Sequence, residues 1–221
     1  DNSIFDVGQL VVAPFLWSKK IGAIDTVVLS HPDSDHLNGL LYILRHFNIG
    51  QVLASPYQAK TEAWHNFLKI IKRRKIQNPW FKDITTTREI NATKIDILYP
   101  FEDSNGYCKR CPGSNNCSIV LRICYKGKSI LFPGDIEKCA ETLIVSKHES
   151  RADSDILIAP HHGSRTSSSR NFLDAVKPDT VIVPVRESRF GPPSQKTLKR
   201  YKRQNYKILR TDKNGAICII V

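Results

Sequence analysis

Methionine and long apolar runs are both missing from the 221-residue sequence. A membrane-spanning helix needs about 18 or more consecutive apolar residues. Apolar stretches such as those at 26–29 and 119–123 have only the length of single strands. Internal repeats, low-complexity tracts and a glycine- or serine-rich linker are missing too. These absences predict a soluble domain that occupies residues 1–221 without a division.

The first residues also lack the features of a signal peptide, namely a charged start followed by an apolar run. Because natural chains begin with methionine, we expect this sequence to be a segment of a longer protein. Its composition, with 41% hydrophobic and 24% charged residues, is that of a folded domain and excludes general disorder.

Acidic side chains are scarce. The sequence has 21 of them and 33 lysines and arginines, which gives a net charge of +12. This charge predicts attraction to a polyanion: nucleic acid, an anionic polymer or a membrane surface. A basic domain that is merely soluble remains an alternative.

Strand-like and helix-like patterns alternate along the chain, which predicts an α/β fold with mixed sheets. The continuous apolar run at 24–29 predicts a strand buried on both faces. Helical spacing follows at 36–47 and at 61–75, and the second of these has a strongly basic far side. Two strands, 207–210 and 216–221, are expected to close the fold.

Polar residues that can bind metals follow three apolar strands directly. In α/β sheets such strand ends converge on one place. Imidazole and carboxylate together suit Zn²⁺, Mn²⁺ or Fe²⁺, and two adjacent ions can share a carboxylate. The residues are His31, Asp33, Asp35 and His36 after the first strand, Asp135 after the second, and His161 and His162 after the third.

Each of these motifs also has a plain structural alternative. Asp35 could cap the helix that starts at His36. Pro133-Gly134-Asp135 is ordinary turn chemistry. The histidine pair could lie in a solvated loop, although Gly163 and Ser164 beside it offer hydrogen-bond donors to an anion.

The motifs His-x-Asp-x-Asp-His, Gly-Asp and Pro-His-His-Gly-Ser together resemble the metallo-β-lactamase superfamily. Within it, the sequence is most similar to the hydrolase domain of the DNA-internalisation competence proteins (ComEC family). The resemblance covers nearly the whole chain and includes residues 5–8, 11–16, 29–40, 116–121, 131–137 and 210–217. It implies an αββα sandwich, here without the opening β-hairpin that should precede Asp6.

The resemblance also implies two divalent metal ions and no organic cofactor. His31 and Asp33 would bind one ion, and Asp35 and His36 the other. Asp135 would bridge the ions, and His162 would complete the second site. Asp35, Asp135 and His161 would take part in the chemical step, and the substrate would be contacted by His161, Ser164, Asn116 and Ser118.

Three departures from the family pattern bear on the metal and the chemistry. Asp33 stands where the wider superfamily has a second histidine, and no histidine lies near Asn116. An oxygen-rich site of this kind favours Mn²⁺, with Zn²⁺ as a second possibility. Relatives often carry a histidine after the glycine at Gly191, where this chain has Pro192, so a proton-transfer role there is in doubt.

The function that the resemblance implies is a metal-dependent nuclease that degrades the non-transported DNA strand during natural transformation. The domain would lie at the extracytoplasmic face of the bacterial inner membrane, beside the transmembrane channel of its parent protein. DNA, single- or double-stranded, would be its partner. The alternatives are hydrolysis of another phosphodiester, or a catalytically weak DNA-binding module.

Cysteines and tyrosines leave further alternatives open. Cys108, Cys111 and Cys117 could belong to a structural metal site or, outside the cytoplasm, a disulfide could join Cys108 to Cys111 or to Cys117. The other three cysteines (Cys124, Cys139 and Cys218) are expected to be buried thiols. Tyr201 and Tyr206 lie among basic residues and could stack on bases, but core tyrosines beneath a basic helix face are favoured.

Overall fold

The computed structural model describes residues 6–78, 87–101, 109–186 and 191–220. No helix in these parts of the chain is long and apolar enough to cross a membrane. The chain divides into two compact units, unit 1 (Asp1–Ile84) and unit 2 (Thr85–Val221). Each unit has its own hydrophobic core.

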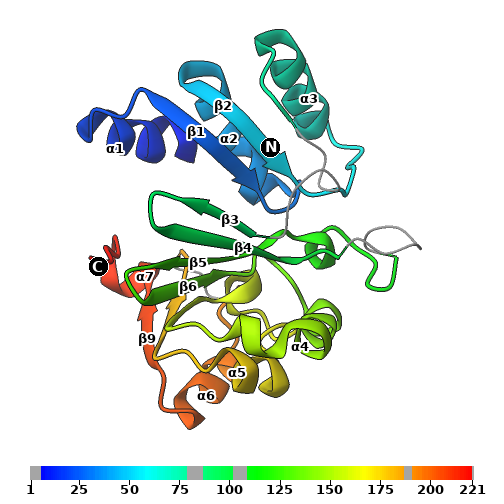
Figure 1. Ribbon diagram of the computed structural model, residues 1–221, viewed down its shortest axis with the longest axis vertical. Coiled ribbons are helices and arrows are strands. Elements are labelled where there is room, and N and C mark those ends of the chain that lie inside the picture. The colour runs from blue at the N-terminus through cyan, green and yellow to red at the C-terminus, as the bar shows by residue number, and fades with distance from the viewer. Residues whose placement is uncertain (1–5, 79–86, 102–108, 187–190, 221) are drawn as a thin grey trace. The chain divides into compact units, whose positions relative to one another are not determined.

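Unit 1 contains a parallel pair of strands, β1 and β2, joined by the crossover helix α2 (Figure 1). Leu37 and Leu44 of α2 pack with Phe47, Val52 and Phe67 in the core of the unit. The elements are η1 (Gly8–Val12), α1 (Ala13–Ser18), β1 (Ala23–Leu29), α2 (Ser34–His46), β2 (Asn48–Ala54) and α3 (Glu62–Arg74).

A close backbone approach in unit 1 explains two glycines of the family-like motifs. A Cβ atom added to Gly8 would lie 1.9 Å from the carbonyl oxygen of Gly39. Only glycine at position 8 therefore allows η1 to lie against α2. This contact holds the middle of α2, the helix that carries Asp35 and His36 in its first turn.

Unit 2 is built on a seven-stranded mixed sheet in the order β3-β4-β5-β6-β7-β8-β9. Strands β3 to β6 form an antiparallel meander, and β6 to β9 are parallel. The strands are β3 (Thr87–Ile90), β4 (Thr93–Tyr99), β5 (Val120–Tyr125), β6 (Lys128–Phe132), β7 (Ile156–Ile158), β8 (Thr180–Val183) and β9 (Lys207–Arg210).

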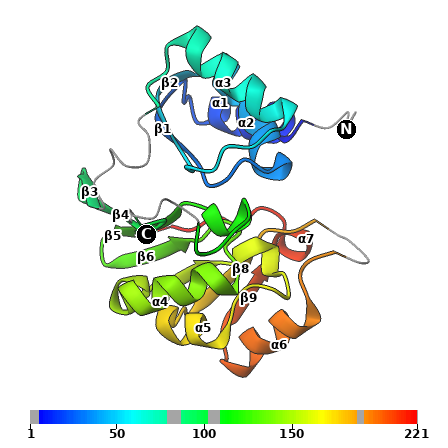
Figure 2. The same ribbon diagram turned by 90° about the vertical axis from the view of Figure 1, so that its right-hand side faces the viewer.

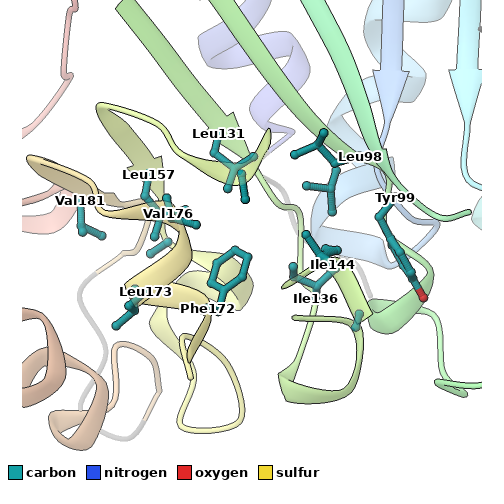
Figure 3. Packing of buried hydrophobic residues seen from close by; sticks show 14 of the residues in the cluster. Leu98, Tyr99, Leu131, Ile136, Ile144, Leu157, Phe172, Leu173, Val176 and Val181 are labelled. Carbon is teal, nitrogen blue, oxygen red and sulfur yellow. The ribbon is translucent and has the colours of Figure 1, made fainter. Parts of the chain in front are cut away.

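Three crossover helices connect the parallel strands and cover one face of this sheet (Figure 2). They are α4 (Lys138–Ala152), α5 (Arg170–Val176) and α6 (Gln195–Arg203), and the short helices η3 (Asn115–Cys117), η4 (Pro160–Gly163) and α7 (Thr211–Asn214) complete the unit. Phe172 and Val176 of α5 pack against Leu131 and Leu157 of the sheet (Figure 3). The carboxyl ends of β6, β7 and β8 consequently lie along one edge of the sheet.

The predicted α/β class with mixed sheets is confirmed, but two strand predictions are wrong. Residues 216–220 form no strand, and β9 pairs with β8. Strand β1 is not buried on both faces, because only Leu29 of its seven residues is buried. The predicted single domain of residues 1–221 stays a prediction.

One cysteine pairing differs from the prediction, and the alternative disulfide between Cys108 and Cys117 stays a prediction. Cys111 forms a disulfide with Cys139, which had been expected to be a buried thiol. Cys117 is disulfide-bonded as well, which leaves no thiolate for a structural metal site here, and Cys108 lies outside the described residues. Cys124 is a half-buried thiol and Cys218 is exposed.

Candidate functional site

The first group of candidate ligands follows β1 in unit 1. Helix α2 begins at Ser34, two residues earlier than predicted, and Asp33 occupies its N-cap position without a capping hydrogen bond from its side chain. Asp35 lies in the first turn rather than at the cap. The structural alternative of Asp35 as a helix cap therefore does not hold.

One hydroxyl contacts both imidazoles of this group. Ser30 Oγ lies 3.1 Å from Nδ1 of the buried His31 and 3.3 Å from Nδ1 of His36. The two rings pack together with centroids 4.2 Å apart. With both Nδ1 atoms turned to Ser30, the Nε2 atoms are the ones directed away from the strand end, which is the orientation that a metal ligand needs.

Each of these Nε2 atoms faces a carboxylate within the same loop. The distance from His31 Nε2 to Asp33 Oδ2 is 3.8 Å, and that from His36 Nε2 to Asp35 Oδ2 is also 3.8 Å. Two ligands of one ion, each bound at about 2.1 Å, lie at most about 4.2 Å apart. Both imidazole–carboxylate pairs satisfy this limit.

The second group lies in unit 2, where β6 leads into Asp135. This aspartate is nearly buried, and its backbone N–H donates to Ser118 Oγ at 3.0 Å. Ser118 in turn donates its hydroxyl proton to the carbonyl of Asn115. The turn after β6 is thus fixed by the segment that precedes β5.

The histidine pair occupies a strained turn after β7. His161, His162 and Gly163 follow one another with φ values of 49°, 53° and 78°. Left-handed backbone costs a non-glycine residue about 1–2 kcal/mol. Such strain persists where the surroundings impose it, and it gathers at functional sites. Here the His161 N–H donates to the carbonyl of Gly134, which ties the turn to the Asp135 loop.

His162 has the geometry of a metal ligand. Its Nδ1 lies 2.8 Å from the carbonyl oxygen of Pro184, just after β8. Because a carbonyl only accepts hydrogen bonds, Nδ1 carries the proton and Nε2 keeps its lone pair. Nε2 lies 3.6 Å from Asp135 Oδ2, within the range for two ligands of one ion.

His161 has a different neighbour. Its Nδ1 lies 3.4 Å from Glu137 Oε1, and its Nε2 lies 4.0 Å from Asp135 Oδ2. Glu137 is held from two sides, because its Oε1 accepts the Thr166 hydroxyl and its N–H donates to Asn116 Oδ1. Glu137 and His161 therefore form an oriented carboxylate–imidazole pair.

A buried carboxylate fixes the rest of the histidine loop. Glu141 of α4 accepts the backbone N–H groups of Ser168 and Ser169, at the start of α5. Burial raises the pKa of the Glu141 carboxyl, and these hydrogen bonds oppose that effect only in part. The loop is thus bonded to the N-cap residue of α4, Glu137, and to its first turn through Glu141.

The ligand atoms in both units fit divalent metal ions. Each unit presents imidazole nitrogen and carboxylate oxygen at mutual distances that one ion can span. Both units also supply hydrogen-bond partners that orient the imidazoles, Ser30 in unit 1 and Pro184 in unit 2. Nitrogen and oxygen in this mixture suit Zn²⁺, Mn²⁺ and Fe²⁺ alike.

Two contributors had not been predicted from the sequence. They are Ser30, which contacts both imidazoles in unit 1, and Glu137, which lies beside His161 in unit 2. Ser118 and Asn116 support the Asp135 loop through hydrogen bonds, and their predicted contact with substrate stays a prediction. Ser164 is half-buried, with its Oγ 3.0 Å from Thr166 Oγ1.

Two curated proteins are similar to nearly the whole of this chain. ComE operon protein 3 of Bacillus subtilis is 28% identical over 217 residues, which are 96% of this chain and 26% of that protein. Competence protein ComA of Neisseria gonorrhoeae is 29% identical over 220 residues, which are 97% of this chain and 28% of that protein. The chain thus spans about a quarter of the length of these relatives.

A solved structure shares the fold. CmlA, a diiron β-hydroxylase from Streptomyces venezuelae, superposes with a TM-score of 0.51 at 16% identity, and the match covers 86% of this chain and 44% of CmlA. The model of the metallo-beta-lactamase superfamily matches residues 4–185, which is well over half of the chain. With the mixed sheet, its crossover helices and the ligand groups at the strand ends, this match shows that the chain belongs to the metallo-beta-lactamase superfamily.

Proposed function

We propose that this chain is a metal-dependent phosphodiesterase that hydrolyses DNA during DNA uptake. The observation that carries the proposal is the pair of ligand groups, each with its imidazoles oriented by hydrogen bonds, in a chain with a net charge of +12. Superfamily members are typically metal-dependent hydrolases. A basic protein with such a site is suited to a polyanionic phosphodiester.

The proposed ligands follow the family pattern. His31 and Asp33 would bind one ion, Asp35 and His36 would bind the other, Asp135 would bridge both, and His162 would complete the second site. The Nδ1–carbonyl hydrogen bond of His162 supports its choice over His161, whose Nδ1 faces a carboxylate. Divalent ions bound there would activate water and neutralise charge on the phosphate.

The remaining roles belong to the protein's own side chains. His161, oriented by Glu137, contacts the phosphate of the substrate and stabilises charge that develops on it. Asp135 keeps its place through the Ser118 hydroxyl, and the strained turn places both imidazoles toward its Oδ2. Ser164 contacts the substrate beside the histidines.

We propose Mn²⁺ as the preferred ion. Asp33 gives the first site a carboxylate where a histidine would favour zinc, so hard, oxygen-preferring ions compete better than in a site of three histidines. Activity with Mn²⁺ is expected to exceed activity with Zn²⁺ at matched free-ion concentration.

The cellular setting is proposed from the relatives and from one structural feature. Competence protein ComA has a name that refers to DNA uptake. The Cys111–Cys139 disulfide is of the kind that persists outside the cytoplasm. We place the chain at the extracytoplasmic face of the inner membrane, next to the channel domain of a longer parent protein, where it degrades the strand that is not taken up.

The test measures hydrolysis of labelled single- and double-stranded DNA by the chain. Reactions contain Mg²⁺, Mn²⁺ or Zn²⁺, or a chelator, and a small phosphodiester is tested in parallel. The proposal expects metal-dependent DNA cleavage that the chelator abolishes and that weakens steeply with salt. Hydrolysis of the small phosphodiester alone would remove DNA as the substrate, and metal-independent DNA binding without turnover would leave a binding module.

A further inference from the structure

Unit 2 carries a surface pocket of about 240 Å³ that lies apart from the histidine turn. Three arginines, Arg170 of α5 with Arg200 and Arg203 of α6, line it together with Leu173 and Gln204. Three arginines around one pocket, with a single carboxylate, Asp174, beside Arg170, give this part of the surface a positive charge that attracts anions. None of these residues belongs to the ligand groups described above.

Arg200 is fixed in place rather than mobile. Its guanidinium donates hydrogen bonds to the backbone carbonyls of Ser168 and Arg165 and to Thr197 Oγ1. These bonds attach α6 to the loop that follows the histidine turn. An arginine held in this way offers its remaining N–H groups without further loss of side-chain entropy.

Asp174 contacts two of the residues that line the pocket. Asp174 lies 3.6 Å from Arg170 Nε and accepts a hydrogen bond from Gln204 Nε2 at 2.8 Å. It therefore holds one arginine and one amide in position across α5 and α6. Arg203 is exposed, and with Asp174 counted against the three arginines the pocket keeps a net positive charge.

Helix α6 links this pocket to the proposed reaction centre. At its start, the Ser194 N–H donates to the carbonyl of Gly163, directly after His162. At its other end stands Arg203, about 13 Å farther along the axis at 1.5 Å for each residue. A nucleic acid strand advances about 3.4 Å for each nucleotide of a duplex, so this distance corresponds to about four nucleotides.

We infer that the three-arginine pocket binds a backbone phosphate of a nucleic acid strand whose scissile phosphate lies at the histidine turn. Arginine is suited to this task because its planar N–H groups match the oxygens of a phosphate. The pocket recognises the backbone and not the sequence. The inference rests on the proposed function, since it assumes that DNA is the substrate.

Binding is measured without turnover, with a fluorescent oligonucleotide of about 20 nucleotides in chelator over a range of salt concentrations. Arg203→Gln and Arg170→Gln are compared with Lys126→Gln, which removes the same charge from an exposed position on the β5–β6 turn of the same unit. Arg200 is left intact because it holds the histidine loop. Hydrolysis of a small phosphodiester is measured for every variant.

We expect each arginine variant to bind about 3- to 10-fold more weakly, with the salt slope smaller by about one phosphate contact. Lys126→Gln should change affinity less than twofold, and all variants should hydrolyse the small phosphodiester like the wild type. Equal losses for Lys126→Gln, or none for the arginines in a chain that cleaves DNA, would overturn the pocket and leave the nuclease standing. A wild type that neither binds nor cleaves DNA would overturn the proposed function itself.

Discussion

The two ends of the parallel strands in unit 2 are built in opposite ways. At the amino ends, the Asp155 carboxylate joins the start of β7 to β6 through hydrogen bonds with Lys128 and Ser129. At the carboxyl ends, the chain enters a strained turn and a nearly buried aspartate. Both ends have carboxylates beside polar partners, but only the second leaves ligand atoms directed toward one another.

The amino-end contacts surround Asp155, which lies just before β7. Its carboxylate accepts hydrogen bonds from the Ser129 N–H and hydroxyl at 2.8 Å and from Lys128 Nζ at 2.7 Å. The Lys128 hydrogen bond is the largest cause that lowers the pKa of Asp155 to about 2. The negative charge of this carboxylate is thus compensated by hydrogen-bond donors and a lysine, and the interaction stabilises the folded state.

At the carboxyl ends, the backbone conformation and the side-chain contacts do not stabilise the fold in this way. His161 and His162 hold left-handed backbone, and Asp135 lies 3.6 Å from the nearer imidazole nitrogen. Placing two imidazoles beside a nearly buried carboxylate gives little to folding unless a cation completes the group. One sheet thus separates the part that stabilises it from the part that we propose performs the chemistry.

The largest effect should come from Asp135→Asn, which keeps the shape of the side chain and removes its charge. We expect DNA hydrolysis to fall by about 10³-fold or more, because the proposed bridging ligand is lost. The thermal midpoint should change little, since the backbone N–H bond to Ser118 remains. Unchanged turnover with unchanged metal content would contradict the assignment of Asp135.

The histidine pair should separate metal binding from rate. His162→Ala is expected to lower the number of bound metal ions, measured by elemental analysis, because the ring fixed on the Pro184 carbonyl is lost. His161→Ala is expected to keep the metal and to lose about 100-fold in rate. The reverse result would exchange the two roles, and no effect from either variant would place this turn outside the reaction.

The sequence predicted the strand ends better than the contacts around them. Apolar strands followed at once by His31, Asp135 or His161 can be recognised from periodicity alone. The role of Ser30 depends on two rings that turn toward one hydroxyl, and that of Glu137 depends on a loop 24 residues later. Such side-chain directions leave no local pattern in a sequence.

The wrong predictions have the same origin. The partner of Cys111 is 28 residues away, and connectivity of this kind cannot be deduced from spacing. The run at 24–29 has the composition of a strand covered on both faces, but its burial depends on which elements pack against it.

The favoured prediction for Tyr201, a core tyrosine, is confirmed. Its side chain is fully buried and its hydroxyl is hydrogen-bonded to Ser168, so it cannot stack on bases.

A smaller effect is expected for Glu137→Gln, which tests whether a residue next to the ligands belongs with the chemistry or with the fold. Glutamine keeps an acceptor for the Thr166 hydroxyl, but the charge beside His161 Nδ1 is lost. We expect kcat to fall about 10-fold with little change in KM or in bound metal. A lower thermal midpoint with unchanged kcat would assign Glu137 to the stability of the fold.

The smallest effect on rate, none, is expected at the amino ends, where Asp155→Asn removes the charge that Lys128 and Ser129 contact. Because folding lowers the pKa of Asp155 from 3.8 to about 2, its contribution to stability is present above pH 4 and is lost as the pH falls toward 2. At pH 7 the variant should lose about 1–2 kcal/mol, or about 2–4 °C in thermal midpoint for each kcal/mol. The difference from the wild type should shrink between pH 4 and pH 2.

The matched control is Asp179→Asn, which changes an exposed carboxylate just before β8 and should alter neither the rate nor the thermal midpoint. A loss of DNA hydrolysis in Asp155→Asn at pH 7 with the fold intact would show that the two ends of the sheet are coupled.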